Sequence, residues 1–244
     1  MQFSTTKAML DIWDAQAGLD HTGRALLLAR VGLGQRCDDP SALPIGERDR
    51  LLLDLRERLF GPRVEVLEQC PGCGVRLEIA FDIDAVRVTP LDRVDSFVTL
   101  EAGGYEISAR LPTSCDLLEL RGCRDVAEAH DRLLANCLVA ASRDGAPVGP
   151  RDLPEAAQLA LSRALGAADP QAEIELELDC SACGHGWRTH FDIVEYLTAE
   201  IEQFGRRTLR DVDLLAGAYG WSEGEILALP PRRRSYYLEQ VFDG

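Results

Sequence analysis

Residues 64–83 read VEVLEQCPGCGVRLEIAFDI, and residues 174–193 read IELELDCSACGHGWRTHFDI. In both stretches, apolar and polar residues alternate on either side of a Cys-x-x-Cys-Gly segment. Alternation with a period of two is typical of β-strands, and the segment between the strands has the composition of a tight turn. Each stretch is therefore predicted to form a β-hairpin whose turn carries a pair of cysteines.

The two stretches are related as an internal repeat. Cys70 and Cys73 lie 110 positions before Cys180 and Cys183, and the same offset relates the Phe-Asp-Ile triplets that end the two stretches. One hairpin supplies only two sulfur ligands, so two related hairpins that face each other would complete a set of four. The repeat thus predicts a single site built with approximate two-fold symmetry.

Four cysteines are the ligand set of a closed, structural zinc site, because Zn²⁺ prefers four tetrahedral ligands. We predict one structural Zn²⁺ ion held by Cys70, Cys73, Cys180 and Cys183, in a zinc ribbon whose halves are separated in sequence. Structural zinc in small finger peptides contributes roughly 10–16 kcal/mol of apparent binding energy. An ion of that affinity can close the long loop between the two hairpins.

Other roles for the cysteines and for one histidine are also consistent with the sequence. The pairs could be redox-active or merely buried, although a thioredoxin-like pair would open a helix. His185 could replace one cysteine ligand. The remaining cysteines, Cys37, Cys115, Cys123 and Cys137, lack paired spacing, and Cys137 is predicted to lie in the core.

The rest of the chain predicts an α+β protein that is built around the split Cys₄ zinc ribbon. We expect a helical N-terminal region (1–62), the first hairpin (63–86), an inserted β-hairpin with helices (87–170), the second hairpin (171–194) and a helical C-terminal tail (195–244).

Several elements can be predicted within these segments. A stripe of leucines predicts an amphipathic helix over Ile45–Phe60, ended by Gly61-Pro62. In the insertion, strands are expected at Phe97–Glu101 and Tyr105–Leu111, and helices at Asp125–Ala141 and Leu153–Leu165. The tail is expected to hold a long helix to about residue 219. A short helix capped by Ser222 and Glu225, and a last helix opened by Pro230-Pro231, follow it.

Composition limits the classes of function. The 41 acidic residues outnumber the 26 basic ones, giving a net charge of −15, whereas nucleic-acid binding requires a basic face. No apolar run approaches the ~18–20 residues of a membrane span, and the first ten residues lack the apolar core of a signal peptide. Lys7 is the single lysine, which indicates a GC-rich bacterial genome. We therefore expect no nucleic acid or membrane partner. The expected location is the bacterial cytoplasm or a larger particle.

Catalytic motifs are absent from the sequence. It contains no Walker loop, no G-x-S-x-G and no H-E-x-x-H, and its four histidines are scattered. The prediction is a protein that is not an enzyme. An enzyme with an unrecognised cleft is the rival interpretation.

Basic and aromatic residues gather in the C-terminal tail, where Arg and Tyr are favoured at protein interfaces. The candidate partner-binding residues are Arg206, Arg207, Arg210, Arg232, Arg233, Arg234, Tyr236 and Tyr237. The alternative is a solvated helix face with Tyr236 or Tyr237 packed inside.

Several short blocks, taken together, resemble a known family. They are Leu43–Asp49, Arg110–Thr113, Asp169–Ile174 and Ala218–Pro230, in addition to the two cysteine segments. This combination resembles the baseplate protein family of T-even-type contractile-tail phages and of phage-derived contractile injection systems. One departure is Leu229-Pro230-Pro231, where the family is expected to have a Ser-Pro at the start of the last helix.

The resemblance implies a non-enzymatic assembly factor, chaperone or minor component of the baseplate hub. Such a protein would bind hub or spike proteins, and no catalytic residues are implied. The alternative function is a zinc-ribbon adaptor that binds nucleic acid or takes part in transcription. The oligomeric state is left open.

Overall fold

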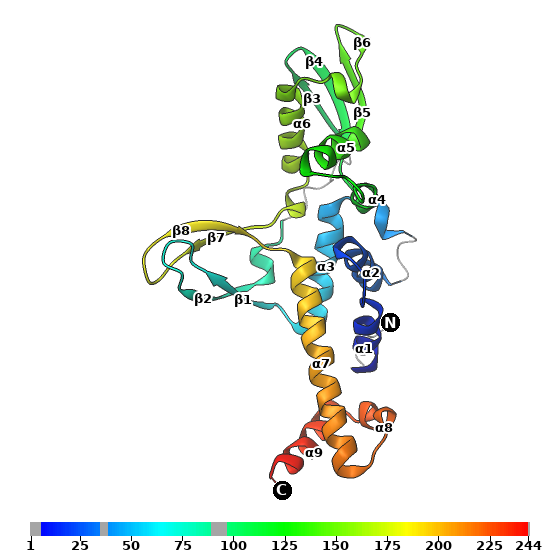
Figure 1. Cartoon of the computed structure of the whole chain (residues 1–244), viewed down its shortest axis with the longest axis vertical. Coiled ribbons are helices and arrows are strands. Elements are labelled where there is room, and N and C mark those ends of the chain that lie inside the picture. Colours follow the sequence, from blue (N-terminus) through cyan, green and yellow to red (C-terminus); the bar gives the residue numbers. More distant parts are fainter. Residues whose placement is uncertain (1–5, 35–38, 89–96, 244) are drawn as a thin grey trace. The chain divides into compact units, whose positions relative to one another are not determined.

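A computed structural model describes residues 6–34, 39–88 and 97–243 (Figure 1). The chain divides into two units, one formed by residues 20–194 and the other by residues 1–19 together with 195–244. The chain mixes helices with small antiparallel sheets. The five-segment division given by the sequence stays a prediction.

The unit of residues 20–194 contains both hairpins, the insertion between them and a helical pair. Its helices are α2 (His21–Leu33), α3 (Ile45–Phe60), α4 (Ser114–Glu119), α5 (Val126–Cys137) and α6 (Glu155–Ala168), with 3₁₀ turns η1 (Pro40–Ala42), η2 (Ile83–Ala85), η3 (Pro150–Asp152) and η4 (Pro170–Ala172). Its strands are β1 (Arg63–Gln69), β2 (Arg76–Asp82), β3 (Phe97–Ala102), β4 (Tyr105–Arg110), β5 (Leu138–Arg143), β6 (Ala146–Pro147), β7 (Glu175–Asp179) and β8 (Gly186–His190).

Helices α2 and α3 pack against each other through small and branched apolar residues. Leu28 on α2 and Leu52 and Leu55 on α3 are completely buried. Helix α3 has the predicted bounds, and its C-cap is Gly61, whose φ of 88° is a conformation that glycine adopts without strain. The leucine stripe of α3 is therefore the core-facing side of this helical pair.

A hydrogen bond links the start of α2 to the end of the second hairpin. Nε2 of His21 lies 2.7 Å from Oδ2 of Asp192, and both side chains are about half exposed. This bond to the Asp192 carboxylate raises the pKa of His21 above its ordinary value, against the smaller opposing effect of burial. The folded chain therefore holds this proton more tightly than the unfolded chain does.

The His21–Asp192 pair gives a small pH dependence of stability. Its contribution is fully present below the unfolded pKa of about 6.5 and is lost as the pH rises through the higher folded pKa. We expect wild type to exceed His21→Gln in free energy of unfolding by more at pH 5.5 than at pH 8.5. The difference should stay below about 1 kcal/mol because the pair is half exposed. Urea titrations at the two pH values measure it, and the same pH dependence in both proteins would contradict it.

A buried polar cluster joins α3 to α4. The Arg48 guanidinium donates to Asp49 at 2.8 Å and to the Ser114 hydroxyl at 3.0 Å, and all three residues are buried. Burial raises the pKa of Asp49 to about 6, although the charge of Arg48 opposes this shift. The hydrogen bonds satisfy both charged groups where water is excluded.

A second buried link runs from α3 to the segment that leads into the second hairpin. The backbone N–H of Gly46 donates to Oδ2 of Asp169 at 2.9 Å, across 123 positions of sequence. Asp169 lies directly before η4, and burial raises the pKa of its carboxyl group. The contact fixes the position at which the chain returns from the insertion.

The insertion folds as a four-stranded antiparallel sheet in the order β3-β4-β5-β6, with α5 and α6 supplying side chains to its core. The predicted β3–β4 hairpin is confirmed, and Gly103 and Gly104 adopt positive φ angles of 62° and 82° in its turn. Ile107 and Ala109 of β4 meet Leu161 of α6 in a buried cluster. One face of the sheet is thus covered by helices.

The predicted helix over Asp125–Ala141 is wrong in its last turn. Helix α5 ends at Cys137, and Leu138 begins strand β5, which pairs with β4. The apolar run continues through this point without a capping signal, so the sequence pattern does not mark the change. The edge of β4 carries backbone N–H and C=O groups that need hydrogen-bond partners. Strand β5 supplies these partners, whereas a longer α5 would leave the groups unpaired.

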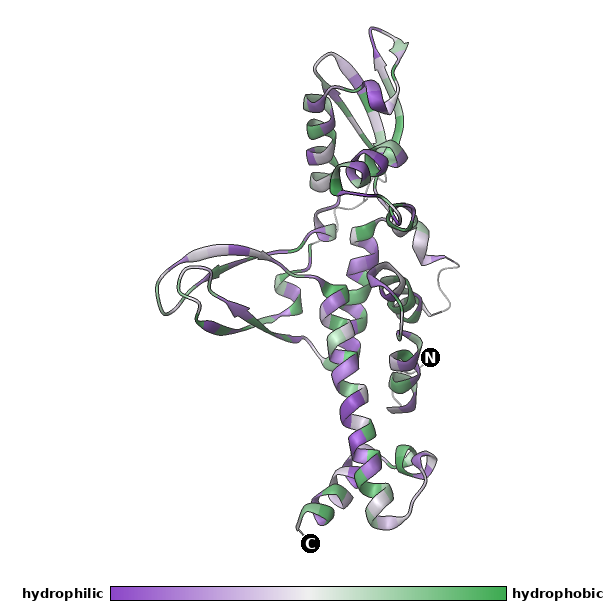
Figure 2. Ribbon diagram, in the orientation of Figure 1, coloured by the Kyte–Doolittle hydropathy of each residue, from purple (hydrophilic) through white to green (hydrophobic). Residues whose placement is uncertain are grey.

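The other unit is helical. It contains α1 (Thr6–Ala15), α8 (Glu223–Ala228), α9 (Pro231–Asp243) and all but the first two residues of α7 (Ile193–Tyr219). Ser222 and Glu225 form the predicted capping box of α8. Val212, Leu215 and Ile226 make a small core that α9 covers. Hydrophobic and hydrophilic residues both occur along α7, and no described helix is apolar and long enough to cross a bilayer (Figure 2).

Helices α1 and α7 approach each other closely at Gly205. A Cβ atom added to Gly205 would lie 2.6 Å from the ring of Trp13, whose Nε1 donates to Glu202 at 2.5 Å. Gly217 lies on the same helix, but a Cβ atom there would meet nothing within 4 Å. These two glycines form a matched pair for a test of the α1–α7 contact.

Gly205→Ala is expected to lower the free energy of unfolding by about 1–3 kcal/mol because Trp13 must move. Gly217→Ala should leave it unchanged or raise it by up to about 1 kcal/mol, since alanine favours helix. Chemical denaturation followed by tryptophan fluorescence measures both values. Equal effects of the two substitutions would contradict the close approach.

Candidate metal centre

The two predicted cysteine hairpins are confirmed, and their turns have the same internal hydrogen bonds. Strands β1 and β2 pair in antiparallel register, as do β7 and β8. In the first turn, the N–H of Cys70 donates to the carbonyl of Val75 at 3.0 Å, and that of Gly74 to the carbonyl of Cys70 at 2.8 Å. The corresponding bonds of the second turn measure 2.9 and 2.8 Å. The repeat therefore extends from sequence to backbone geometry.

A glycine follows the second cysteine of each turn for a conformational reason. Gly74 and Gly184 have φ angles of 75° and 70°, which a residue with a side chain adopts only with strain. This backbone reversal lets the chain leave the turn beside the strand by which it entered. Both sulfur atoms of a pair can then lie on the same side of the turn.

The four cysteines converge on one point. Sγ of Cys70 lies 3.7 Å from Sγ of Cys183, and Sγ of Cys73 lies 3.7 Å from Sγ of Cys180. All four sulfur atoms lie within 4.8 Å of one another. Each short distance joins one hairpin to the other, so the cluster belongs to both hairpins equally.

These distances fit a tetrahedral metal site. Zinc–sulfur bonds of about 2.3 Å give a tetrahedron whose edges are about 3.8 Å long. A disulfide bond would instead bring two sulfur atoms to about 2.05 Å. The first cysteine of each pair is buried, with Cys70 and Cys180 at 1% and 2% exposure. Such a cluster can bind a single ion and shield it partly from solvent.

Hydrogen bonds divide the protons unequally among the thiols. Burial opposes ionisation of Cys180, but the backbone N–H groups of Cys183 and Ala182 and a hydrogen bond from Cys70 lower its pKa to about 7. The N–H of His185 favours the Cys183 thiolate, yet hydrogen bonds to the neighbouring sulfurs raise its pKa to about 12. The Cys180 thiol is therefore easier to ionise than the Cys183 thiol, and each thiolate that forms repels the others. A bound cation would remove that repulsion.

His185 is not part of the sulfur cluster. Its ring packs against Gly72, where an added Cβ atom would lie 3.0 Å from the ring, and stacks with Trp187 at 6.4 Å between centroids. The histidine thus fills the space between the tips of the two hairpins.

The remaining cysteines lie elsewhere. Cys137 is completely buried in the core of the insertion, as predicted, and burial raises its pKa to about 11. Cys115 is exposed and donates to the hydroxyl of Ser41, and Cys123 is half-buried. Cys37 lies outside the described residues.

An aromatic contact joins the two hairpins at the end opposite the cysteines. The rings of Phe81 and Phe191 meet edge to face with centroids 5.5 Å apart. Ile83 and Ile193, two residues further along, are both almost completely buried. Each Phe-Asp-Ile triplet therefore lies where a hairpin ends and the next helical element begins, which is η2 after the first hairpin and α7 after the second.

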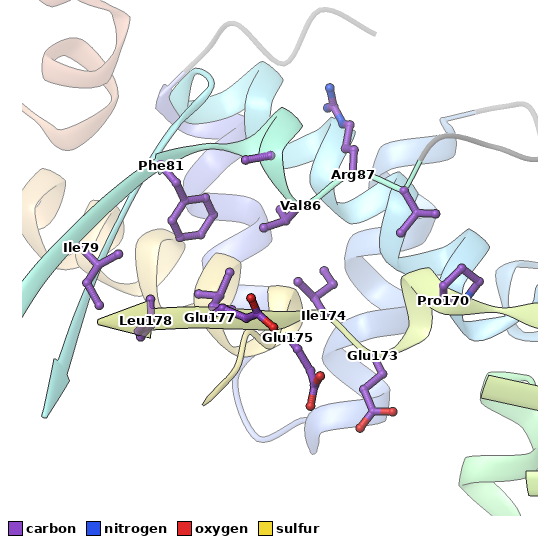
Figure 3. Close-up of a pocket in the computed structure, with 13 residues that line it drawn as sticks. Ile79, Phe81, Val86, Arg87, Pro170, Glu173, Ile174, Glu175, Glu177 and Leu178 are labelled. Atoms are coloured by element: carbon purple, nitrogen blue, oxygen red, sulfur yellow. The ribbon is translucent and has the colours of Figure 1, made fainter. Parts of the chain in front are cut away.

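A pocket of about 500 Å³ lies between β2 and β7, beside this aromatic contact (Figure 3). Ile79 and Phe81 of β2 point toward Ile174 and Leu178 at the opposite wall. The lining is mainly apolar and includes Glu173, Glu175, Glu177 and Arg87, and the part of the chain that the structure describes adds no histidine, cysteine or serine to it.

The candidate partner-binding residues fall into different environments. Arg206 pairs with Glu202 at 2.6 Å, and Arg207 and Arg210 are exposed on α7. On α9, Arg232, Arg233 and Tyr236 are exposed, and Tyr237 is half-buried. Arg234 is buried and donates to the hydroxyl of Thr6 on α1 at 3.2 Å.

Sequence reasoning did not identify the contacts made by Gly46 and Asp169. Both residues lie in blocks that carried the family resemblance, Leu43–Asp49 and Asp169–Ile174. The structure joins these blocks through the Gly46–Asp169 hydrogen bond.

A comparison with models of known protein families gives a match over most of the chain. The family model described as "T4 bacteriophage base plate protein" matches residues 32–198, which include both cysteine hairpins and the insertion. No curated protein and no solved structure matches the chain.

Proposed function

This chain belongs to the T4 bacteriophage base plate protein family, and on that premise we propose that it is a non-enzymatic component or assembly factor of the baseplate hub. It would act by binding other baseplate proteins of a contractile phage tail or of a phage-like injection system. The family match over residues 32–198 carries this proposal. The expected partners are hub or spike proteins. The protein would work in the bacterial cytoplasm during assembly or within the particle.

The cysteine cluster would hold one structural Zn²⁺ ion, with Cys70, Cys73, Cys180 and Cys183 as its ligands. The 3.7 Å sulfur–sulfur distances support a tetrahedral ion, and thiolate ligands favour zinc among the common divalent metals. Residues 63–86 and 171–194 would then form one zinc ribbon, with residues 87–170 inserted between its halves. The ion's role is to fix the ribbon, because all four ligands come from the protein and leave no position for a substrate.

A role without catalysis is supported by the chemistry of the pocket between the hairpins. Its wall offers apolar side chains and exposed carboxylates, together with Arg87, which is bound to Glu57 and Asp84. A catalytic pocket usually brings together a nucleophile, an acid or base and a stabilising group. Among residues 6–34, 39–88 and 97–243, the side chains that line this pocket supply no such set.

Co-expression with the neighbouring tail genes tests the proposal. We expect an affinity-tagged copy of the full chain to retain a hub or spike protein, identified by mass spectrometry after purification. The untagged chain serves as the control for nonspecific retention. Recovery of no tail protein from the complete set of genes would contradict the proposed function.

The purified particle distinguishes the two forms of this role. A structural component should be found in intact particles at a fixed ratio to a hub protein. An assembly factor should be found in assembly intermediates and be absent from the finished particle. Quantitative mass spectrometry of both fractions measures the ratio.

A further inference from the structure

One face of α9 combines exposed arginines with supported aromatic rings. Arg232, Arg233, Ser235, Tyr236, Tyr237 and Glu239 line a pocket of about 750 Å³ on this helix. We call this face, with the neighbouring ring of Tyr219, the α9 surface. It lies wholly within the helical unit formed by residues 1–19 and 195–244.

The aromatic rings of the α9 surface are held by the core beneath them. The Trp221 ring stacks on Tyr219 at 4.7 Å and meets Tyr237 edge to face at 4.9 Å. Trp221 and Tyr237 pack on the core of Val212, Leu215 and Ile226. Tyr236 extends this group outward, with its ring 5.7 Å from that of Tyr237 and 56% of the residue exposed.

Rings supported in this way lose little freedom when a partner binds. Large aromatic side chains with fixed orientation are typical of the residues that contribute most to protein interfaces. Tyr236 is therefore a preorganised contact point, and about half of its surface is accessible to a partner.

The arginines of the α9 surface are available for an external partner. Many arginines of this chain pair with nearby carboxylates, as Arg63 does with Glu65 and Arg124 with Glu128. Arg232 and Arg233 are exposed and form no ion pair within residues 6–34, 39–88 and 97–243. Glu239 is the single acidic residue among the described residues that line the pocket. The surface is thus locally positive on a chain whose net charge is −15.

We propose that the α9 surface binds an acidic segment of another baseplate protein, with carboxylates on Arg232 and Arg233 and an apolar or aromatic side chain against Tyr236. Guanidinium–carboxylate pairs supply orientation and the rings supply buried area. A nucleic acid is the less suitable polyanion, since its repeated phosphates would also face the acidic remainder of the chain. This inference rests on the proposed function and names the chemistry of the partner.

Fluorescence anisotropy with defined peptides tests the proposal on the full chain. The probe is a labelled twelve-residue peptide that alternates aspartate and glutamate with leucine and phenylalanine. Its controls are one peptide with lysines and one with serines in place of the acidic residues, and a single-stranded DNA of similar length. We expect the acidic peptide to bind at least about tenfold more tightly than the two control peptides and the DNA. High salt should lower the affinity for the acidic peptide.

Variants connect this binding to the α9 surface. The double variant R232E/R233E should lower the affinity for the acidic peptide by about tenfold or more. Tyr236→Ala should lower it by about three- to tenfold. R151E/R163E makes the same change in net charge at exposed arginines of the other unit and should bind as wild type does. Thermal melting within a few degrees of wild type shows that each variant is folded.

Three outcomes would overturn the proposal: equal binding of acidic and serine peptides, tighter binding of DNA, or unchanged binding by R232E/R233E. Its failure can be told apart from failure of the proposed function. If R232E/R233E still retains the hub or spike protein in the co-expression experiment, the baseplate role stands and the α9 surface is excluded. If wild type retains no tail protein, the baseplate role itself fails.

Discussion

Cys180→Ser is expected to reduce bound zinc from about one ion per chain to less than a tenth, measured by elemental mass spectrometry of natively purified protein. Cys180 is 2% exposed and its sulfur lies 3.7 Å from that of Cys73 on the other hairpin. The remaining three thiolates cannot complete a closed tetrahedral site. Zinc binding to such sites is coupled to folding, so a loss of several kcal/mol should lower the melting temperature by about 10 °C or more.

The matched control is Cys115→Ser, which replaces an exposed cysteine outside the cluster. It should retain both the ion and the melting temperature of wild type. A strong chelator should lower the melting temperature of wild type toward that of Cys180→Ser and leave Cys180→Ser itself unchanged. Metal-free wild-type protein, or a Cys180→Ser variant with full zinc content, would contradict the proposed site.

Gly46→Ala is expected to lower the free energy of unfolding of the unit of residues 20–194 by about 3 kcal/mol. A Cβ atom at Gly46 would overlap the carboxylate of Asp169 and lie 2.9 Å from the backbone nitrogen of Ala172. The buried carboxylate would have to move, and its 2.9 Å hydrogen bond from the Gly46 N–H would break. The cost combines overpacking with an unsatisfied buried polar group.

Gly166→Ala provides the control because Gly166 lies within α6 and an added Cβ atom meets nothing within 4 Å. It should be neutral or stabilise the protein by up to about 1 kcal/mol. Urea denaturation followed by circular dichroism measures both variants. Equal stability of Gly46→Ala and Gly166→Ala would contradict the close contact between Gly46 and the Asp169 carboxylate.

The cysteine hairpins could be predicted from sequence because their signals are local. Alternation around Cys70 and Cys180, and a glycine after the second cysteine, each depend on a few neighbouring residues. The convergence of the two cysteine pairs is a long-range contact. The internal repeat predicted it because each hairpin carries only two of the four ligands that a closed site needs. Sequence reasoning therefore succeeded where a long-range contact was implied by symmetry.

Long-range contacts without such a signal could not be predicted. Nothing in the pattern around Gly46 indicates that its backbone approaches Asp169, and nothing near Arg48 indicates a buried bond to Ser114. The change from helix to strand at Leu138 was missed for the same reason. The edge of β4 decides that change, and β4 is separated from it by α4 and α5. Local propensity was overridden there by pairing with a distant strand.

The separation of the cysteine pairs along the chain imposes an order on synthesis. Cys73 and Cys180 are 107 positions apart, so translation at about 5–20 residues per second leaves a delay of roughly 5 to 20 s between them. During that interval the first pair has left or is leaving the ribosome with no opposite sulfurs to meet. Four-fold coordination thus becomes possible only after the whole insertion has been translated, and a chain truncated within the insertion can supply at most half of the ligands.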